Sequence, residues 1–204
     1  MNKLLLIVSV LFLLGLGLLV FFPNYECSET AQENFLLNKP FAEIRQYVAI
    51  GGFNQEIITA NNIKVLKQEI RNSSLRIHKP LSPERDWEGT QEIYVEALAN
   101  TDYGEVHVSI IQTITIGKNI INVKTKLDKP LSVGVTELNQ EINIEPSQNQ
   151  TIIHISCKMT VKRKVPKALQ QTVKEQISLA TQKTVRDIKS LLQNPKKGIL
   201  IPLN

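Results

Sequence analysis

The feature that most constrains this chain is an apolar run near its start, Leu4–Phe22, which contains no charged residue and is followed directly by Pro23. An α-helix rises about 1.5 Å per residue, so a helix over this run would be roughly 28 Å long, close to the ~30 Å hydrocarbon core of a bilayer. We therefore expect residues 1–22 to form an N-terminal signal-anchor transmembrane helix. The chain that follows is polar enough to be soluble.

Two alternatives compete with an uncleaved anchor. A cleaved signal peptide usually has an apolar core of about 7–15 residues that ends at small residues, whereas here only Ser28 and Thr30 form a poor pair of this kind. Cys27 lies about where a lipoprotein signal would place its acylated cysteine, but residues 24–26 lack the small and branched side chains of such a site. The anchor is the favoured interpretation.

Charges around the run predict its orientation. Lys3 precedes it, whereas Glu26 and Glu29 follow it. Because positive residues tend to remain on the cytoplasmic side, we expect a single-pass protein of the cell membrane whose C-terminal domain is extracytoplasmic. The membrane is then one partner, through the N-terminal helix, and another protein of the envelope is a candidate second partner. Nucleic acid is not expected as a partner in that location.

The remainder of the chain has the size of one domain, and no Gly-, Pro- or Ser-rich segment divides it. We expect a juxtamembrane linker over 23–32, an α+β domain over 33–197 and a C-terminal tail over 198–204. Basic residues are concentrated toward the end: residues 158–197 hold 11 Lys and Arg but only two acidic residues. This segment is either attracted to anionic lipid headgroups or, as we favour, a solvated helix face that balances an acidic sheet.

Hydrophobic periodicity predicts the order of elements. Turn signals divide a series of strand-like runs, and in the last run alternate residues from Ile153 to Val161 share one face, as expected for a sheet with one buried side. After Val165-Pro166 the apolar spacing changes to three and four residues and continues to Asn194, which predicts a helix of about 28 residues. The expected elements are a strand over 33–37, a helix over 41–48, strands over 63–69, 74–78, 91–99, 105–116, 120–127, 135–144 and 151–162, and the long helix.

Two segments carry a resemblance to a known family. Residues 35–44, Phe-Leu-Leu-Asn-Lys-Pro-Phe-Ala-Glu-Ile, look like an opening strand, proline turn and first helix, and the helix over 165–194 follows the last strand. In this the chain resembles the START-like superfamily (SRPBCC, helix-grip, Bet v 1-like), here as a membrane-anchored member. The resemblance implies an antiparallel sheet that wraps a long C-terminal helix, with an apolar ligand held between them. It brings no functional residue with it.

Chemistry-bearing residues are sparse. His78, His107 and His154 lie on expected strands without the spacing of metal ligands, although His107 and His154 are candidates for neighbours across the sheet. Four carboxylates near Trp87 are better explained by a solvated loop than by an active site. Cys27 and Cys157 leave a disulfide open, but a buried, unpaired Cys157 is the simpler interpretation. We expect no catalytic residues, no metal site and no cofactor.

Three functions remain open. The first is a noncatalytic binding module for a lipid or another hydrophobic small molecule. The second is a structural or partner-binding protein of an envelope complex, with a core filled by its own side chains, and the third, weaker one is a hydrolase or cyclase of the same superfamily. If a ligand is bound, we expect it at the inner face of the last strand and the long helix, at Ile153, Ile155, Met159, Val173 and Ile177. Direct packing of these residues on one another would favour the filled core.

Overall fold

The structure is a computed structural model that describes residues 23–49, 63–78, 86–101 and 104–194. The expected anchor over 1–22 and tail over 198–204 lie outside the described residues, so the anchor stays a prediction. Within the described ranges, no helix has the length and apolar character needed to cross a membrane. The elements are β1 (Asn24–Leu37), α2 (Phe41–Ala49), β2 (Lys64–Ser73), β3 (Arg76–His78), β4 (Asp86–Thr101), β5 (Gly104–Ile116), β6 (Ile121–Leu127), β7 (Val135–Ser147), β8 (Gln150–Lys164), the 3-10 turn η1 (Lys167–Leu169) and α4 (Gln170–Gln193).

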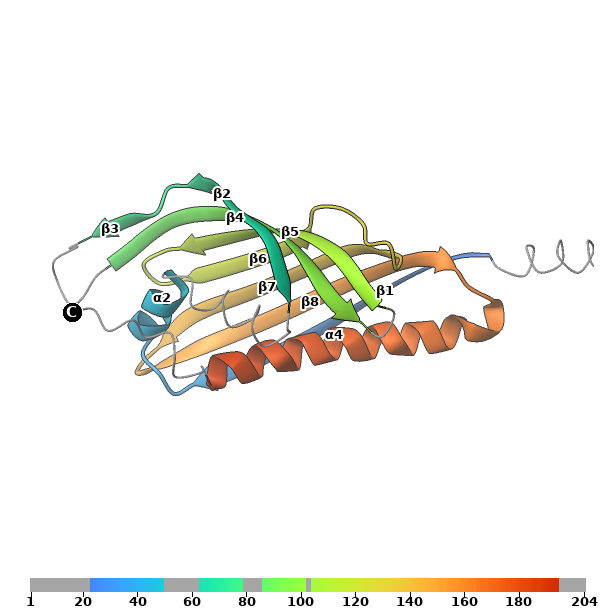
Figure 1. The fold of residues 1–204 in the computed structure, drawn as a ribbon. Helices are drawn as coiled ribbons and strands as arrows, with labels where there is room; N and C mark the ends of the chain where they lie inside the picture. Colours follow the sequence, from blue (N-terminus) through green and yellow to red (C-terminus); the bar gives the residue numbers. More distant parts are fainter. Residues whose placement is uncertain (1–22, 50–62, 79–85, 102–103, 195–204) are drawn as a thin grey trace, which may run out of the picture.

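An antiparallel sheet forms the body of the molecule. Its strands lie in the order β1-β8-β7-β6-β5-β4-β2, and β3 pairs with β4 beside this path. From β4 to β8 the strands follow one another as a meander, while β1 returns from the start of the chain to pair with β8. Figure 1 shows the curved sheet with α4 running along β1 and β8. The short α2 lies at the end of the sheet where β1 ends and β8 begins. The expected α+β class, an antiparallel sheet with a long C-terminal helix, is confirmed.

The opening strand corrects one expectation. Residues 23–32 were expected to form a linker, but β1 begins at Asn24 and pairs with β8 over its whole length, from Asn24 opposite Lys164 to Leu37 opposite Thr151. The strand is held by its ladder and by side chains on the face toward α4, where Glu29 and Glu33 form ion pairs with Lys174 and Lys189 of the helix. This segment is therefore part of the domain.

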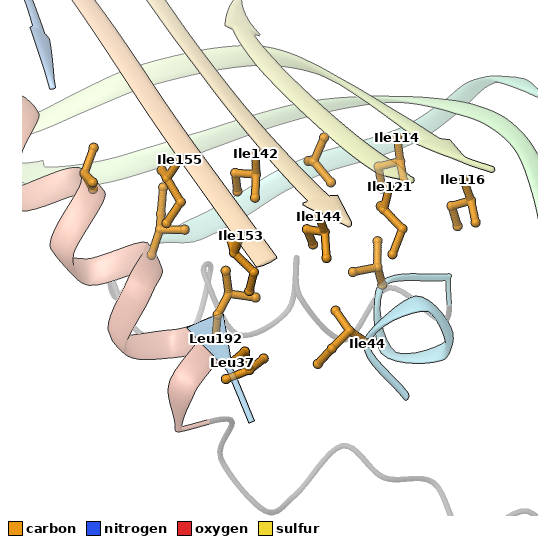
Figure 2. Close-up of a cluster of buried hydrophobic side chains, with 14 of the residues drawn as sticks. Leu37, Ile44, Ile114, Ile116, Ile121, Ile142, Ile144, Ile153, Ile155 and Leu192 are labelled. Carbon is orange, nitrogen blue, oxygen red and sulfur yellow. The ribbon is translucent and has the colours of Figure 1, made fainter. Parts of the chain in front are cut away.

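The core lies on the inner face, which we define as the side of the sheet that packs on α4 and α2. Rows of isoleucine and valine cross β5 to β8 at the end of the sheet nearest α2, and Figure 2 shows them between the two helices. The main cluster includes Ile116, Ile121, Ile144 and Ile153, which are at most 1 % exposed. A smaller cluster lies at the other end and consists of Cys27, Val161, Val165, Val173 and Ile177. The two clusters attach α4 to the sheet along its length.

Gly89 supplies a test of the sheet geometry. Its φ of +131° is unfavourable for side chains, and a Cβ there would lie 2.4 Å from the Ser74 carbonyl oxygen. Gly104 also has positive φ, +99°, but a Cβ there would meet nothing within 4 Å. We expect Gly89→Ala to lower the free energy of unfolding by about 2–4 kcal/mol and Gly104→Ala by about 1 kcal/mol, since only the first adds a backbone clash to the strain. Urea unfolding of both variants measures their free energies of unfolding. Equal losses of stability in the two variants would contradict this expectation.

Candidate functional site

The inner face of the sheet changes character from one end to the other. Because the register is known, side chains that share a level can be followed across the strands. At the α2 end two levels are filled by buried aliphatic residues, for example Ile114, Val123, Ile142 and Ile155 on neighbouring strands. The next level, going toward the first residue of β1, is polar, and the level after it is apolar but only partly covered. The candidate site is formed by these last two levels.

The first of them, the polar row, consists of Gln112 of β5, Thr125 of β6, Gln140 of β7 and Cys157 of β8, which are consecutive register partners. Gln112 Nε2 donates a hydrogen bond to Thr125 Oγ1 at 3.3 Å, and both residues are buried. The Gln140 side chain hydrogen-bonds the Cys157 thiol, yet burial of the thiol dominates and raises the pKa of Cys157 to about 11. Cys157 is therefore a neutral thiol at physiological pH and not an activated nucleophile.

The second, the half-buried row, consists of Val95 of β4, Ile110 of β5, Leu138 of β7 and Met159 of β8. Val95 is the register partner of Ile110, and Leu138 is the partner of Met159. All four are only partly buried, in contrast to the aliphatic rows nearer α2. The contacts of α4 with the sheet fall on β1 and β8, beside this row rather than across all of it. The row is an apolar surface with the polar row along one margin.

Charge is distributed unevenly around this surface. The described inner-face side chains of β4 to β8 are uncharged around these two rows: their register positions hold aliphatic, small, amide and hydroxyl side chains, one thiol and the Met159 thioether. Arg163, at the far end of β8, is the charged exception on this face. The inner face of β1 does carry Glu29 and Glu33, but both are paired with lysines of α4. The surface is thus suited to a neutral molecule that is apolar over most of its length, with amide and hydroxyl groups available for one polar group.

The five sequence-predicted ligand residues do not form one site. Ile153 and Ile155 are 0 % and 1 % exposed and lie in the main cluster with residues of α4. Val173 and Ile177 lie in the smaller cluster, against which Met159 packs from the side. Four of the five therefore fill the contact between β8 and α4, and only Met159 belongs to the half-buried row. Their role in binding a ligand stays a prediction.

Sequence reasoning did not single out Val95, Ile110 and Leu138. A signal for this region is nevertheless present in β5, where Gln112 interrupts the apolar alternation of Ile110 and Ile114. Thr125 interrupts β6 in the same way. That these interruptions fall on one level depends on the register of neighbouring strands, which the turns determine and the pattern within one strand does not reveal.

The other candidate residues stay apart. His107 Nε2 lies 3.1 Å from a carboxylate oxygen of Glu96, and His154 Nδ1 lies 2.9 Å from Oδ1 of Asn34, both on the outer face. Because β6 and β7 separate β5 from β8, the two histidines are not neighbours. The part of the chain that the structure describes contains no group of three side chains able to hold a metal ion. The side chain of Trp87 lies outside that part.

Both cysteines are free and buried, so the unpaired state expected for Cys157 is confirmed.

The outer face has a shallow, open hollow of about 320 Å³ over β6, β7 and β8. Two of its three lysines are paired within the sheet: Lys124 Nζ lies 3.3 Å from Glu141, and Lys158 Nζ lies 3.0 Å from Glu137. The Lys158 ammonium and the Thr160 hydroxyl hold the pKa of Glu137 below its ordinary value. Two of the three lysines that line the hollow are therefore neutralised within the protein, without a bound ligand.

Comparison with known proteins supports the architecture. The protein TTHA0849 from Thermus thermophilus superimposes with a TM-score of 0.50 at 8% identity, covering 81% of this chain and 95% of that one. The Zhui aromatase/cyclase from Streptomyces sp. R1128 gives 0.49 at 10% identity, covering 81% and 92%. A START superfamily protein from Mycobacterium smegmatis gives 0.40 at 12% identity, covering 79% and 98%. No family model and no curated protein matches the sequence. The likeness to TTHA0849 supports the helix-grip fold, an antiparallel sheet packed on a long C-terminal helix.

Proposed function

We propose that this protein is a membrane-tethered, extracytoplasmic and noncatalytic binding module for a lipid or another hydrophobic small molecule. The half-buried row is the observation that carries the proposal. Burial of apolar surface is worth roughly 25 cal/mol per Å², so an elongated apolar molecule laid on Val95, Ile110, Leu138 and Met159 would gain affinity from area alone. Ligand sites are mostly apolar with a few placed polar groups, which is the combination that the two rows present.

The polar row gives this site its specificity. Gln112 and Gln140 each carry an amide with both donor and acceptor atoms, and Thr125 adds a hydroxyl. Such groups bind a carbonyl, hydroxyl or ester without requiring a charge on the ligand. The uncharged surroundings of the two rows disfavour a bare carboxylate or phosphate at the same place, because a buried charge needs a partner. A neutral lipid or a similar apolar metabolite is therefore the favoured class.

The tether supports the same proposal. An apolar run able to span a bilayer ends at Phe22, and β1 begins at Asn24. A domain attached this closely would remain beside the membrane, where hydrophobic molecules are concentrated. The charges of Lys3, Glu26 and Glu29 support an extracytoplasmic domain.

A fluorescent probe tests the binding site. N-phenylnaphthylamine is neutral and apolar, and we expect saturable fluorescence enhancement with the soluble domain that begins at Pro23. Ile110→Trp fills the half-buried row and is expected to weaken binding about tenfold or more, since the probe then loses its contact area. Ile111→Trp is the matched control: Ile111 is also half-buried but faces the outer side of β5. Its affinity is expected to equal that of the unaltered domain.

One observation favours a second function. Four of the residues first expected to hold a ligand are packed in the two clusters, as a structural or partner-binding protein with a filled core would require. In that case the half-buried row would face another protein of the envelope. A probe that gives no saturable enhancement, or that binds both tryptophan variants equally, would reject the ligand site and favour this alternative.

A further inference from the structure

The basic C-terminal segment divides into two parts that behave differently. Along α4, Lys174 Nζ lies 3.8 Å from a carboxylate oxygen of Glu29, and Lys189 forms an ion pair with Glu33. Lys189 also lies over the Phe35 ring, 5.4 Å from its centroid. These two helix lysines balance acidic residues of β1 within the fold. The positive charge of α4 is thus partly used in holding the helix on the sheet.

The residues before α4 are not used in this way. Arg163 and Lys164 end β8, and Lys167 begins η1; all three are exposed, and none forms an ion pair with a described residue. Lys162, beside them, lies 3.5 Å from Glu26. We call Arg163, Lys164 and Lys167 the basic end. Leu169, in the same turn, is 52% exposed and adds an apolar side chain to it.

The basic end lies beside the point where the chain leaves the apolar run. The register places Asn24 opposite Lys164 and Tyr25 opposite Arg163, and the Val165 amide donates a hydrogen bond to the Pro23 carbonyl at 3.2 Å. Asn24, the register partner of Lys164, follows the apolar run by two residues in the sequence, and two residues of extended chain reach at most about 7 Å. Attraction of exposed charges to the membrane surface acts over roughly the Debye length, about 8 Å at physiological ionic strength.

From this placement and its charge we propose that the basic end binds the anionic headgroups of the membrane in which the apolar run is inserted. The contact holds the domain end-on, with β1, β8 and α4 rising from the bilayer and α2 at the far end. Each Lys or Arg near an anionic surface raises the equilibrium constant for membrane contact roughly fivefold. Three unpaired charges therefore suffice to orient a domain that is already tethered. The inference rests on the tether of the proposed function but not on its ligand.

Lysine acetylation of the full chain in liposomes measures the contact. We expect the Lys164 and Lys167 amines to react about threefold or more slowly in bilayers that contain phosphatidylglycerol than in phosphatidylcholine alone, because headgroup contact shields them. Lys183, about 24 Å further along the helix direction by rise per residue, is the internal control and should react equally in both. High salt should remove the protection, since the Debye length falls to about 3 Å at 1 M.

Charge-reversal variants make the test specific. Arg163→Glu with Lys167→Glu should abolish the protection of Lys164, whereas Lys183→Glu with Arg186→Glu, an equal change of charge on exposed positions of α4, should leave it intact. Equal acetylation of Lys164 in neutral and anionic bilayers, or equal effects of the two variants, would overturn the proposal. Flotation with neutral liposomes reports the tether separately. A chain that fails to float there contradicts the tether, and the basic end is then judged by whether anionic liposomes restore flotation.

Discussion

A domain that begins at Pro23 is expected to fold, whereas one that begins at Glu33 is expected to lose cooperative tertiary structure. The shorter chain lacks nine of the 14 residues of β1. It also loses the ladder to the second half of β8, the Cys27 side chain of the smaller cluster and the ion pair between Glu29 and Lys174. The edge of β8 and the underside of α4 would then be exposed to water.

Circular dichroism during heating measures this difference. The longer domain should melt in one cooperative transition, and the shorter one should show no such transition. Replacement of residues 24–32 by a flexible Gly-Ser segment of equal length is the control, and it should behave like the shorter domain because it keeps the chain length but not the side chains. A cooperative transition in the domain that begins at Glu33 would show that the segment is a linker after all.

Ile153→Asp is expected to unfold the domain, whereas Ile152→Asp is expected to leave it folded. Ile153 is 0% exposed in the middle of the main cluster, and a carboxylate there costs several kcal/mol because it lacks a partner in an apolar surrounding. Such a cost is comparable with the total stability of a domain, about 5–15 kcal/mol. Ile152 is half-buried on the outer face, opposite the exposed Leu36.

Urea unfolding measures the stability of both variants. The Ile152→Asp domain should keep its unfolding slope and shift its midpoint modestly, since its carboxylate remains in contact with water. The Ile153→Asp domain should lack a folded baseline. If both variants lost similar stability, the assignment of the two faces of β8 would be wrong.

The sequence predicted those features of the fold that short-range periodicity determines. Alternation in β8 placed Ile153, Ile155 and Cys157 on one buried face, and the change of period after Pro166 placed the long helix. The helix proper has 24 residues, and it is shorter than expected because residues 165–169 form the strand exit and η1 before it. These features depend on neighbours in the chain, which the sequence displays directly.

The remaining features of the fold are determined by contacts between residues that lie far apart in the sequence. The first part of β1 has no apolar alternation, because inner positions such as Glu29 and Glu33 are acidic and are accommodated only by lysines of α4. The half-buried row was likewise not predictable, since it is defined by where α4 and α2 leave the sheet partly uncovered. Apolar residues on an inner face look the same in the sequence whether a helix covers them or a ligand does.

The central claim is that the half-buried row binds a hydrophobic molecule. Native mass spectrometry of the detergent-free domain that begins at Pro23 tests it most directly, because a ligand retained from the cell adds its own mass. The account predicts a discrete apolar adduct that the Ile111→Trp domain retains and the Ile110→Trp domain lacks. A bare mass for the unaltered, folded domain, or an adduct that survives Ile110→Trp, would contradict it.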